Sequence, residues 1–185
     1  HSLYVASDED EAKYPDFLRK AEKRLAKAQR KLSQKQKESH NREKQRLRVA
    51  ILHEKVANQR RDFLHKKARY LADRYDVIGI EDISVKAMAK RKKGGKFSFG
   101  KSVADNGWNM FTNMLEYKLA WQGKKLIKID KWYPSSQLCH VCGYQNHETK
   151  DLSVREWDCP KCGSHHNRDK NAAINIREEA RRISA

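Results

Sequence analysis

The chain carries SSQLCHVCGYQ at residues 135–145 and REWDCPKCGSHHNRDKNAA at residues 155–173, and these two stretches decide the fold of its C-terminal part. Each stretch contains one C-x-x-C pair, and sixteen residues separate the pairs, which are Cys139 with Cys142 and Cys159 with Cys162. Two residues between thiolates allow one tight turn to present both sulfurs to a metal ion. The spacing therefore predicts one structural zinc ion, because a shell of four thiolates leaves no open position for catalysis.

The alternative use of four cysteines is a pair of disulfide bonds. Nothing in the sequence suggests secretion into an oxidising compartment, so the zinc site is the favoured interpretation. Three histidines lie nearby, at His140, His165 and His166. Because four sulfurs already complete the shell, we expect these histidines to be nucleic-acid contacts or plain surface and not zinc ligands.

The charge balance indicates a polyanionic partner. The 185 residues include 41 Lys and Arg against 24 Asp and Glu, which gives a net charge of +17. Such an excess favours binding to nucleic acid, although a merely soluble basic surface would have the same composition. No apolar run approaches the roughly 20 residues that a membrane helix needs, so no membrane partner is expected.

A helical hairpin is predicted over residues 15–75. Apolar residues recur at spacings of three and four before and after the break KESHN (37–41), which predicts two antiparallel helices with a narrow apolar seam. The seam residues are Leu18, Ala21, Leu25, Ala28, Leu32, Val49, Leu52, Val56, Phe63 and Tyr70. The basic outer faces are either solvated or a basic arm that lies along a nucleic-acid backbone.

Acidic residues follow a short apolar run. Val77, Ile78 and Ile80 predict a buried strand that ends at Glu81, and KKLIKID (124–130) predicts a second strand. Glu81 could reach a site at the edge of the sheet, or it could be an ordinary acid in the turn after a strand. HSLYVASD (1–8) is interpreted as the second half of a hairpin whose first half lies upstream.

Two helices and a basic loop complete the chain. KRKKGGKFSFGKSVADNG (90–107) is basic and glycine-rich, which predicts a loop. A helix should begin near Asp105 and end at Gly123, and a last helix should run over residues 169–182 with Ala172, Ala173 and Ile176 facing inward. The candidate nucleic-acid contacts are Lys90, Arg91, Lys92, Lys93, Lys96, Phe97, Phe99 and Arg168. The two phenylalanines could stack on unpaired bases or pin the loop to the protein.

The order of these segments resembles a known family. A strand that ends in IED, a basic loop, a helix, KLIKID, YPSSQ, two C-x-x-C pairs and then HNRDKNAAINI are similar to the C-terminal part of the RuvC-like nuclease in transposon-encoded TnpB (OrfB-type) proteins, which are related to compact type V CRISPR effectors. The resemblance implies an α/β fold with an RNase H-like (RuvC) mixed sheet that lacks its first strand, a long helical hairpin and an inserted zinc ribbon. It implies a partial nuclease core over residues 1–134, a ribbon that binds target nucleic acid over residues 135–166, and a last RuvC segment over residues 167–185.

The same resemblance implies a function. Such proteins are RNA-guided DNA endonucleases of the prokaryotic cytoplasm and nucleoid, with a guide RNA and a target DNA as partners. Three acids hold two Mg²⁺ ions in that family; the second matches Glu81 and the third matches Asp169. The first is expected in a G-I-D-x-G strand immediately before residue 1, in an N-terminal part of the same protein. We therefore expect the chain alone to be inactive.

Two alternatives remain open at this point. The first is a zinc-ribbon module that grips RNA or DNA without cutting it. The second is a basic interaction protein that zinc stabilises and that has no catalytic role.

Overall fold

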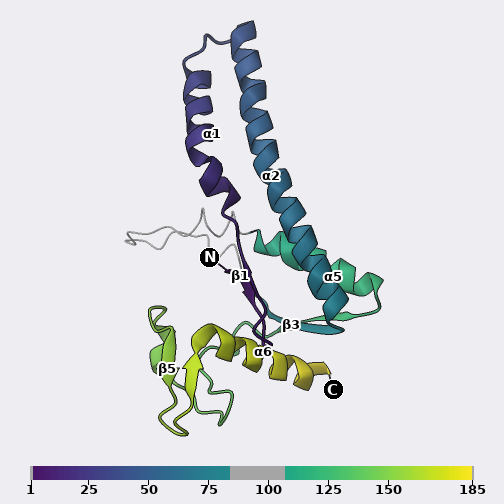
Figure 1. Ribbon diagram of the computed structural model, residues 1–185, viewed down its shortest axis with the longest axis vertical. Coiled ribbons are helices and arrows are strands. Elements are labelled where there is room, and N and C mark those ends of the chain that lie inside the picture. Colours follow the sequence, from purple (N-terminus) through teal and green to yellow (C-terminus); the bar gives the residue numbers. More distant parts are fainter. Residues whose placement is uncertain (1, 84–106, 185) are drawn as a thin grey trace.

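The computed structural model describes residues 2–83 and 107–184, and its helices and strands are arranged as Figure 1 shows. In chain order the elements are β1 (Ser2–Val5), β2 (Glu11–Lys13), α1 (Phe17–Ser33), α2 (His40–Arg74), β3 (Val77–Glu81), α5 (Trp108–Trp121), β4 (Lys125–Ile129), the 3₁₀ helix η1 (His147–Lys150), β5 (Glu156–Asp158), β6 (His165–Asn167) and α6 (Arg168–Ser184). Residues 90–106 of the basic loop lie outside the described residues, and with them all its candidate contacts from Lys90 to Phe99. Among the described helices none combines the length and the apolarity that crossing a membrane requires.

The predicted helical hairpin is confirmed. Helices α1 and α2 pack side by side and extend away from the rest of the chain (Figure 1). Ser39 caps α2, because its hydroxyl accepts a hydrogen bond from the backbone N–H of Arg42 at 3.2 Å. Leu25 and Val56 are buried in the seam as expected. Tyr70 is the exception: it is 40% exposed, since Leu71 and Ala72 turn inward at that point of α2.

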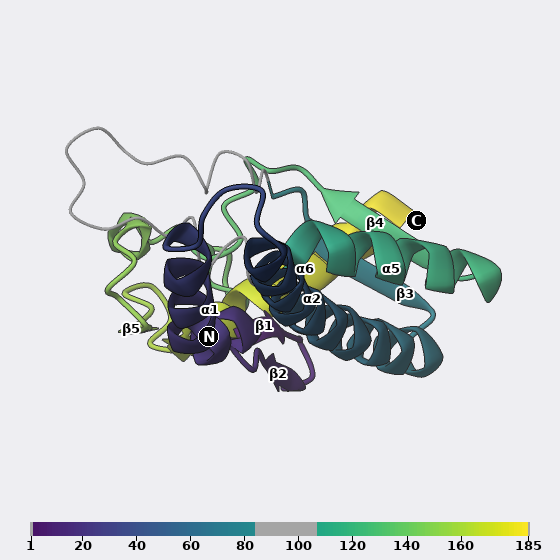
Figure 2. The same cartoon turned by 90° about the horizontal axis from the view of Figure 1, so that it is seen from above.

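The main hydrophobic core lies where the C-terminal half of α2 meets α5 and the β1–β2 hairpin. Leu64, Ala68 and Leu119 are completely buried there, and Tyr4 of β1 stacks on Phe111 of α5 with ring centroids 5.9 Å apart. The helix predicted to end at Gly123 is present as α5, which begins at Trp108 and buries Phe111, Leu115 and Leu119. Figure 2 shows α5 alongside α2, and β3 alongside β4.

The described strands do not form one continuous RNase H-like (RuvC) mixed sheet. Among the described residues they form three separate two-stranded sheets, in which β1 pairs with β2, β3 with β4 and β5 with β6. One edge of β1 pairs with β2, the strand that follows it, and the upstream hairpin partner of HSLYVASD stays a prediction. The intervening acidic turn, with Glu9 at φ 70°, reverses the chain tightly enough for Glu11 to pair with Val5.

The position of α6 is set by a glycine in β3. Strands β3 and β4 are parallel and pair Val77 with Lys125 through Glu81 with Ile129. A Cβ on Gly79 would lie 2.6 Å from the Cβ of Ala180, so the absence of a side chain lets α6 approach the strand closely. Successive side chains of a strand point to opposite faces, so Glu81 shares the face of Gly79. The helix that covers Gly79 therefore also lies next to Glu81.

Asp8, which follows β1, accepts a hydrogen bond from the hydroxyl of Tyr75 and pairs with Arg74 at 3.3 Å, so the hairpin turn is attached to the end of α2. The Tyr75 hydroxyl holds the pKa of Asp8 below its usual value.

Between β1 and β3 lies a cavity of about 420 Å³, which is lined by the end of β1, by Val77 to Gly79 and by one face of α6.

Candidate functional site

The two cysteine pairs lie in loops of the same geometry. The backbone N–H of Cys139 donates to the carbonyl of Tyr144 and that of Gly143 donates to the carbonyl of Cys139, both at 2.8 Å. The second loop repeats the pattern, with Cys159 bonded to Ser164 at 2.9 Å and Gly163 to Cys159 at 2.8 Å. Each glycine has a φ near +70°, which residues with a Cβ seldom adopt. The sequence thus forms two equivalent turns that each present a pair of sulfurs.

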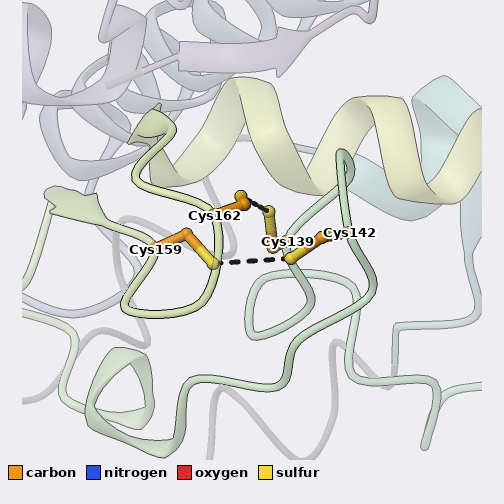
Figure 3. Close-up of side chains that lie close together, drawn as sticks. All are labelled: Cys139, Cys142, Cys159 and Cys162. Atoms are coloured by element: carbon orange, nitrogen blue, oxygen red, sulfur yellow. Dashed lines mark hydrogen bonds between the residues drawn. The ribbon is translucent and has the colours of Figure 1, made fainter.

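The four sulfurs converge on one point. They lie within 4.8 Å of one another, and Cys139 is 3.7 Å from Cys162 while Cys142 is 3.6 Å from Cys159 (Figure 3). A tetrahedron with zinc–sulfur bonds of about 2.3 Å has sulfurs about 3.8 Å apart, whereas a disulfide bond is about 2.05 Å long. All four cysteines are free thiols. The disulfide alternative is therefore wrong, and the residues fit a closed structural zinc site.

The environment of these thiols differs from one residue to the next. Cys139 and Cys159 are buried, and burial raises the pKa of the Cys139 thiol. Cys162 is exposed, and its contact with the hydroxyl of Ser164, 3.3 Å away, lowers its pKa to about 6. Thiolates are the form of cysteine that binds zinc.

The histidine next to this cluster corrects one expectation. His166 is not a surface residue: it is 3% exposed, with its Nε2 3.1 Å from the sulfur of Cys139 and its ring against Trp157. It supports a ligand and is not itself in the four-residue cluster. His165 is exposed beside Asp158, and the exposed ring of His140 contacts Asn171 on α6.

Replacing one cysteine should remove the zinc. Cys159→Ala leaves three ligands, and because structural zinc in small modules contributes about 10–16 kcal/mol to folding, we expect the residues around β5 and β6 to lose order. Elemental analysis should fall from one zinc per chain to near zero, and the indole NMR signal of buried Trp157 should move to its random-coil position. Val141→Ser is the matched control, since Val141 lies in the same kind of turn but is 59% exposed. Full zinc content in Cys159→Ala would contradict the assignment.

Two carboxylates predicted from distant parts of the sequence line one pocket. Glu81 ends β3 and Asp169 lies in the first turn of α6, and both border a pocket of about 400 Å³. Glu81 accepts a hydrogen bond from the hydroxyl of Ser135, and Asp169 lies 3.6 Å from the guanidinium of Arg155. The Asp169 side chain is 56% exposed, so it is open to a ligand from solvent. Carboxylate oxygens are the ligands that Mg²⁺ prefers.

Other predicted residues occupy defined places around this pocket. Arg168 also lines it and donates to the carbonyl of Asp151 at 3.3 Å. The last helix is confirmed, but Ala172, Ala173 and Ile176 are only half-buried, and they border the 400 Å³ pocket.

Three buried polar residues of this region were not predicted from the sequence: Ser135, Asn171 and Asn175. The available signal was the spacing of the two asparagines, four residues apart in an otherwise apolar segment of α6.

Family models cover most of the chain. Residues 1–92 match the model described as OrfB_IS605, "Probable transposase", and residues 108–176 match the model described as "Cas12f1-like, TNB domain". The second match includes the four cysteines and ends within α6.

Two curated proteins match most of this chain. A protein of Streptomyces pristinaespiralis named "Putative RNA-guided DNA endonuclease" is 42% identical over 175 residues, which are 95% of this chain and 42% of that protein. The protein of Escherichia coli named "Putative RNA-guided DNA endonuclease InsQ" is 36% identical over 168 residues, covering 85% of this chain and 41% of that protein. The chain thus spans about two fifths of the length of these relatives.

Solved structures share the fold. The protein chain in "Cryo-EM structure of the Cas12f1-sgRNA-target DNA complex" superimposes with a TM-score of 0.56 at 23% identity, covering 90% of this chain and 43% of that chain. Both family models and the curated relatives point to the family that the sequence resembles. The chain belongs to the TnpB (OrfB-type) family of transposon-encoded proteins, which is related to the compact CRISPR effector Cas12f1.

Proposed function

We propose that this chain is the C-terminal part of an RNA-guided DNA endonuclease, in which Glu81 and Asp169 belong to a RuvC-type active site. One observation carries the proposal: two carboxylates 88 positions apart border the same pocket, next to the zinc module. The names of the curated relatives support it, since the two described above are both named as RNA-guided DNA endonucleases.

Within this proposal Glu81 and Asp169 hold Mg²⁺ at the edge of the β3–β4 pair. Two Mg²⁺ ions at such a site would activate the attacking water and stabilise the leaving oxygen of a phosphodiester. Ser135 would keep Glu81 oriented, because its hydroxyl donates to the carboxylate. Arg155 and Arg168 lie beside Asp169 and would contact the phosphates of the cleaved strand.

A third acid is needed, and the cavity between β1 and β3 suggests where it enters. Each of these strands has one partner among the described residues, and both border the 420 Å³ cavity. A strand from the N-terminal part of the same protein would fill it, join β1 to β3 in one RNase H-like sheet and bring the first aspartate toward Glu81. Burial of Val77, which is 48% exposed, would accompany its entry.

The remaining parts would bind nucleic acid. In this proposal residues 1–134 form the nuclease core with its hairpin, residues 135–166 form the ribbon that contacts target DNA, and residues 167–185 complete the core. The hairpin supports such a role through a groove of about 500 Å³ between its helices, which is lined by Arg24, Lys27, Lys31 and Arg48 among others. Guide RNA and target DNA would both be partners.

The test is cleavage by the full-length protein that contains this chain. RNA that copurifies with the protein would be sequenced, and DNA complementary to it would be offered with and without Mg²⁺. Cleavage that requires both the matching sequence and Mg²⁺ is the expected result. Tight binding with no cleavage in Mg²⁺ would instead favour the alternative of a zinc-ribbon module that binds nucleic acid without cutting it.

A further inference from the structure

Two asparagine side chains of α6 are buried against the zinc module. Asn171 is 1% exposed and Asn175 is 6% exposed, and their separation of four residues places them on one face of the helix. Buried amides are costly unless every polar group has a partner. The hydrogen-bond partners of Asn171 and Asn175 therefore identify the groups that hold α6 at this position.

Both asparagines bind the segment that carries the first zinc ligand. The Asn171 amide donates to the carbonyl of Leu138 at 2.7 Å, and its oxygen accepts from the backbone N–H of His140 at 3.1 Å. The Asn175 amide donates to the same Leu138 carbonyl at 2.7 Å and to the carbonyl of Ser135 at 2.8 Å. Leu138 and His140 are the two neighbours of Cys139, so α6 holds the backbone on both sides of that ligand.

The same segment reaches the other carboxylate. Ser135 is 3% exposed; its carbonyl is held by Asn175, and its hydroxyl donates to Glu81. Asp169 lies two residues before Asn171, in the first turn of α6. Continuous hydrogen bonds therefore connect the first zinc loop to the helix of Asp169 in one direction and to Glu81 in the other.

We propose that zinc positions the carboxylate pair, with Asn171, Asn175 and Ser135 as the positioning residues. A bound metal fixes Cys139 and its neighbours; Leu138 and His140 then hold the start of α6, while Ser135 holds Glu81. Loss of zinc frees the loop and, with it, both carboxylates. The effect on cleavage rests on the proposed function, but the mechanical coupling of zinc to α6 does not.

Hydrogen exchange of the zinc-loaded chain tests the coupling directly. In the parent chain, removal of zinc with a chelator should raise the exchange rates of the amides of residues 168–176 about tenfold or more, since several buried hydrogen bonds lose their fixed partner. In Asn171→Leu/Asn175→Leu, which has side chains of similar size without amides, the chain should still hold one zinc. Its α6 amides should exchange at the same fast rate with zinc and without it.

A matched control separates coupling from simple loss of helix stability. Asn167 caps α6 by accepting from the backbone N–H groups of Asp169 and Lys170, both at 3.2 Å, and these bonds do not involve the loop of Cys139. Asn167→Ala should speed exchange in α6 in both states and leave the zinc-dependent difference intact. The single variants Asn171→Ser and Asn175→Ser give the same comparison if the double variant loses zinc.

A second readout follows the carboxylates. In the full-length protein, binding of Mn²⁺ should weaken about 10–100-fold in Ser135→Ala and in the asparagine variants, as is usual when residues that orient metal ligands are removed. Ser135→Ala should leave α6 exchange unchanged. Absence of Mn²⁺ binding in the parent, with zinc-dependent protection of α6 intact, would overturn the proposed nuclease site and leave the coupling standing.

Two results would overturn the proposal itself. One is an α6 whose exchange does not respond to zinc in the parent chain. The other is a double variant that keeps the full zinc-dependent difference of the parent, because the asparagines would then be packing residues only.

Discussion

Nucleic-acid affinity of this chain should fall by roughly 10³–10⁵ between about 50 and 200 mM salt, as expected for a protein with about 6–10 phosphate contacts. The physical reason is release of the counterions condensed on the polyanion when Lys and Arg replace them. A net charge of +17 and the basic groove between α1 and α2 supply the contacts. The measurement is a fluorescence-anisotropy titration of a labelled single-stranded DNA at a series of salt concentrations.

A triple variant locates the contacts. Lys27→Gln/Lys31→Gln/Arg48→Gln removes three charges from the groove of the hairpin, which should lower the slope of log K against log [salt] by about two to three. Lys66→Gln is the control, because Lys66 is already paired with Asp62 at 2.7 Å. A parent affinity that stays flat over this range of salt would favour a basic interaction protein over a nucleic-acid binder.

Neutralising either carboxylate of the pocket should abolish cleavage. Asp169→Asn and Glu81→Gln keep the shape of each side chain, and the amide oxygen introduced by Glu81→Gln can still accept from Ser135, but both variants lose the charge that a divalent ion requires. Charge stabilisation by metal ions is worth several kcal/mol in the transition state, so we expect kcat of the full-length protein to fall at least about 10³-fold. DNA binding should change little, since neither substitution removes a positive charge.

Asp82→Asn is the control for both variants. Asp82 follows Glu81 directly, but it lies beyond the end of β3, is exposed and does not line the pocket of Glu81 and Asp169. The cleavage activity of Asp82→Asn should equal that of the parent. Cleavage by Asp169→Asn at the parent rate would remove Asp169 from the active site.

Local patterns predicted much of this structure. The spacing of three and four in residues 18–32 specifies α1, and the apolar run before Glu81 specifies β3, because both depend on periodicity within a short window. The spacing of the cysteines predicted the metal site, because two residues between cysteines allow one tight turn to present both sulfurs to the same ion. Glycines at the turns supplied the positive φ values that those loops need.

Features that depend on three-dimensional neighbours were not predictable in this way. Pairing of β1 with β2 depends on a three-residue strand, Glu11–Lys13, which is too short to show a pattern. Burial of His166, Asn171 and Asn175 depends on the ribbon packing against α6, and polar residues carry no hydrophobic period that would indicate it. Tyr70 was misplaced because the seam changes face where α2 leaves α1 and meets α5.

The most direct test of the account is the location of divalent metal in a crystal of the full-length protein grown with Mn²⁺. We predict an anomalous manganese peak in the pocket of β3 and α6, about 2.0–2.2 Å from carboxylate oxygens of both Glu81 and Asp169, together with zinc at the four cysteines. A third carboxylate from the strand that fills the cavity beside β3 should complete the shell. Manganese bound elsewhere, with Glu81 and Asp169 pointing away from each other, would contradict the central claim.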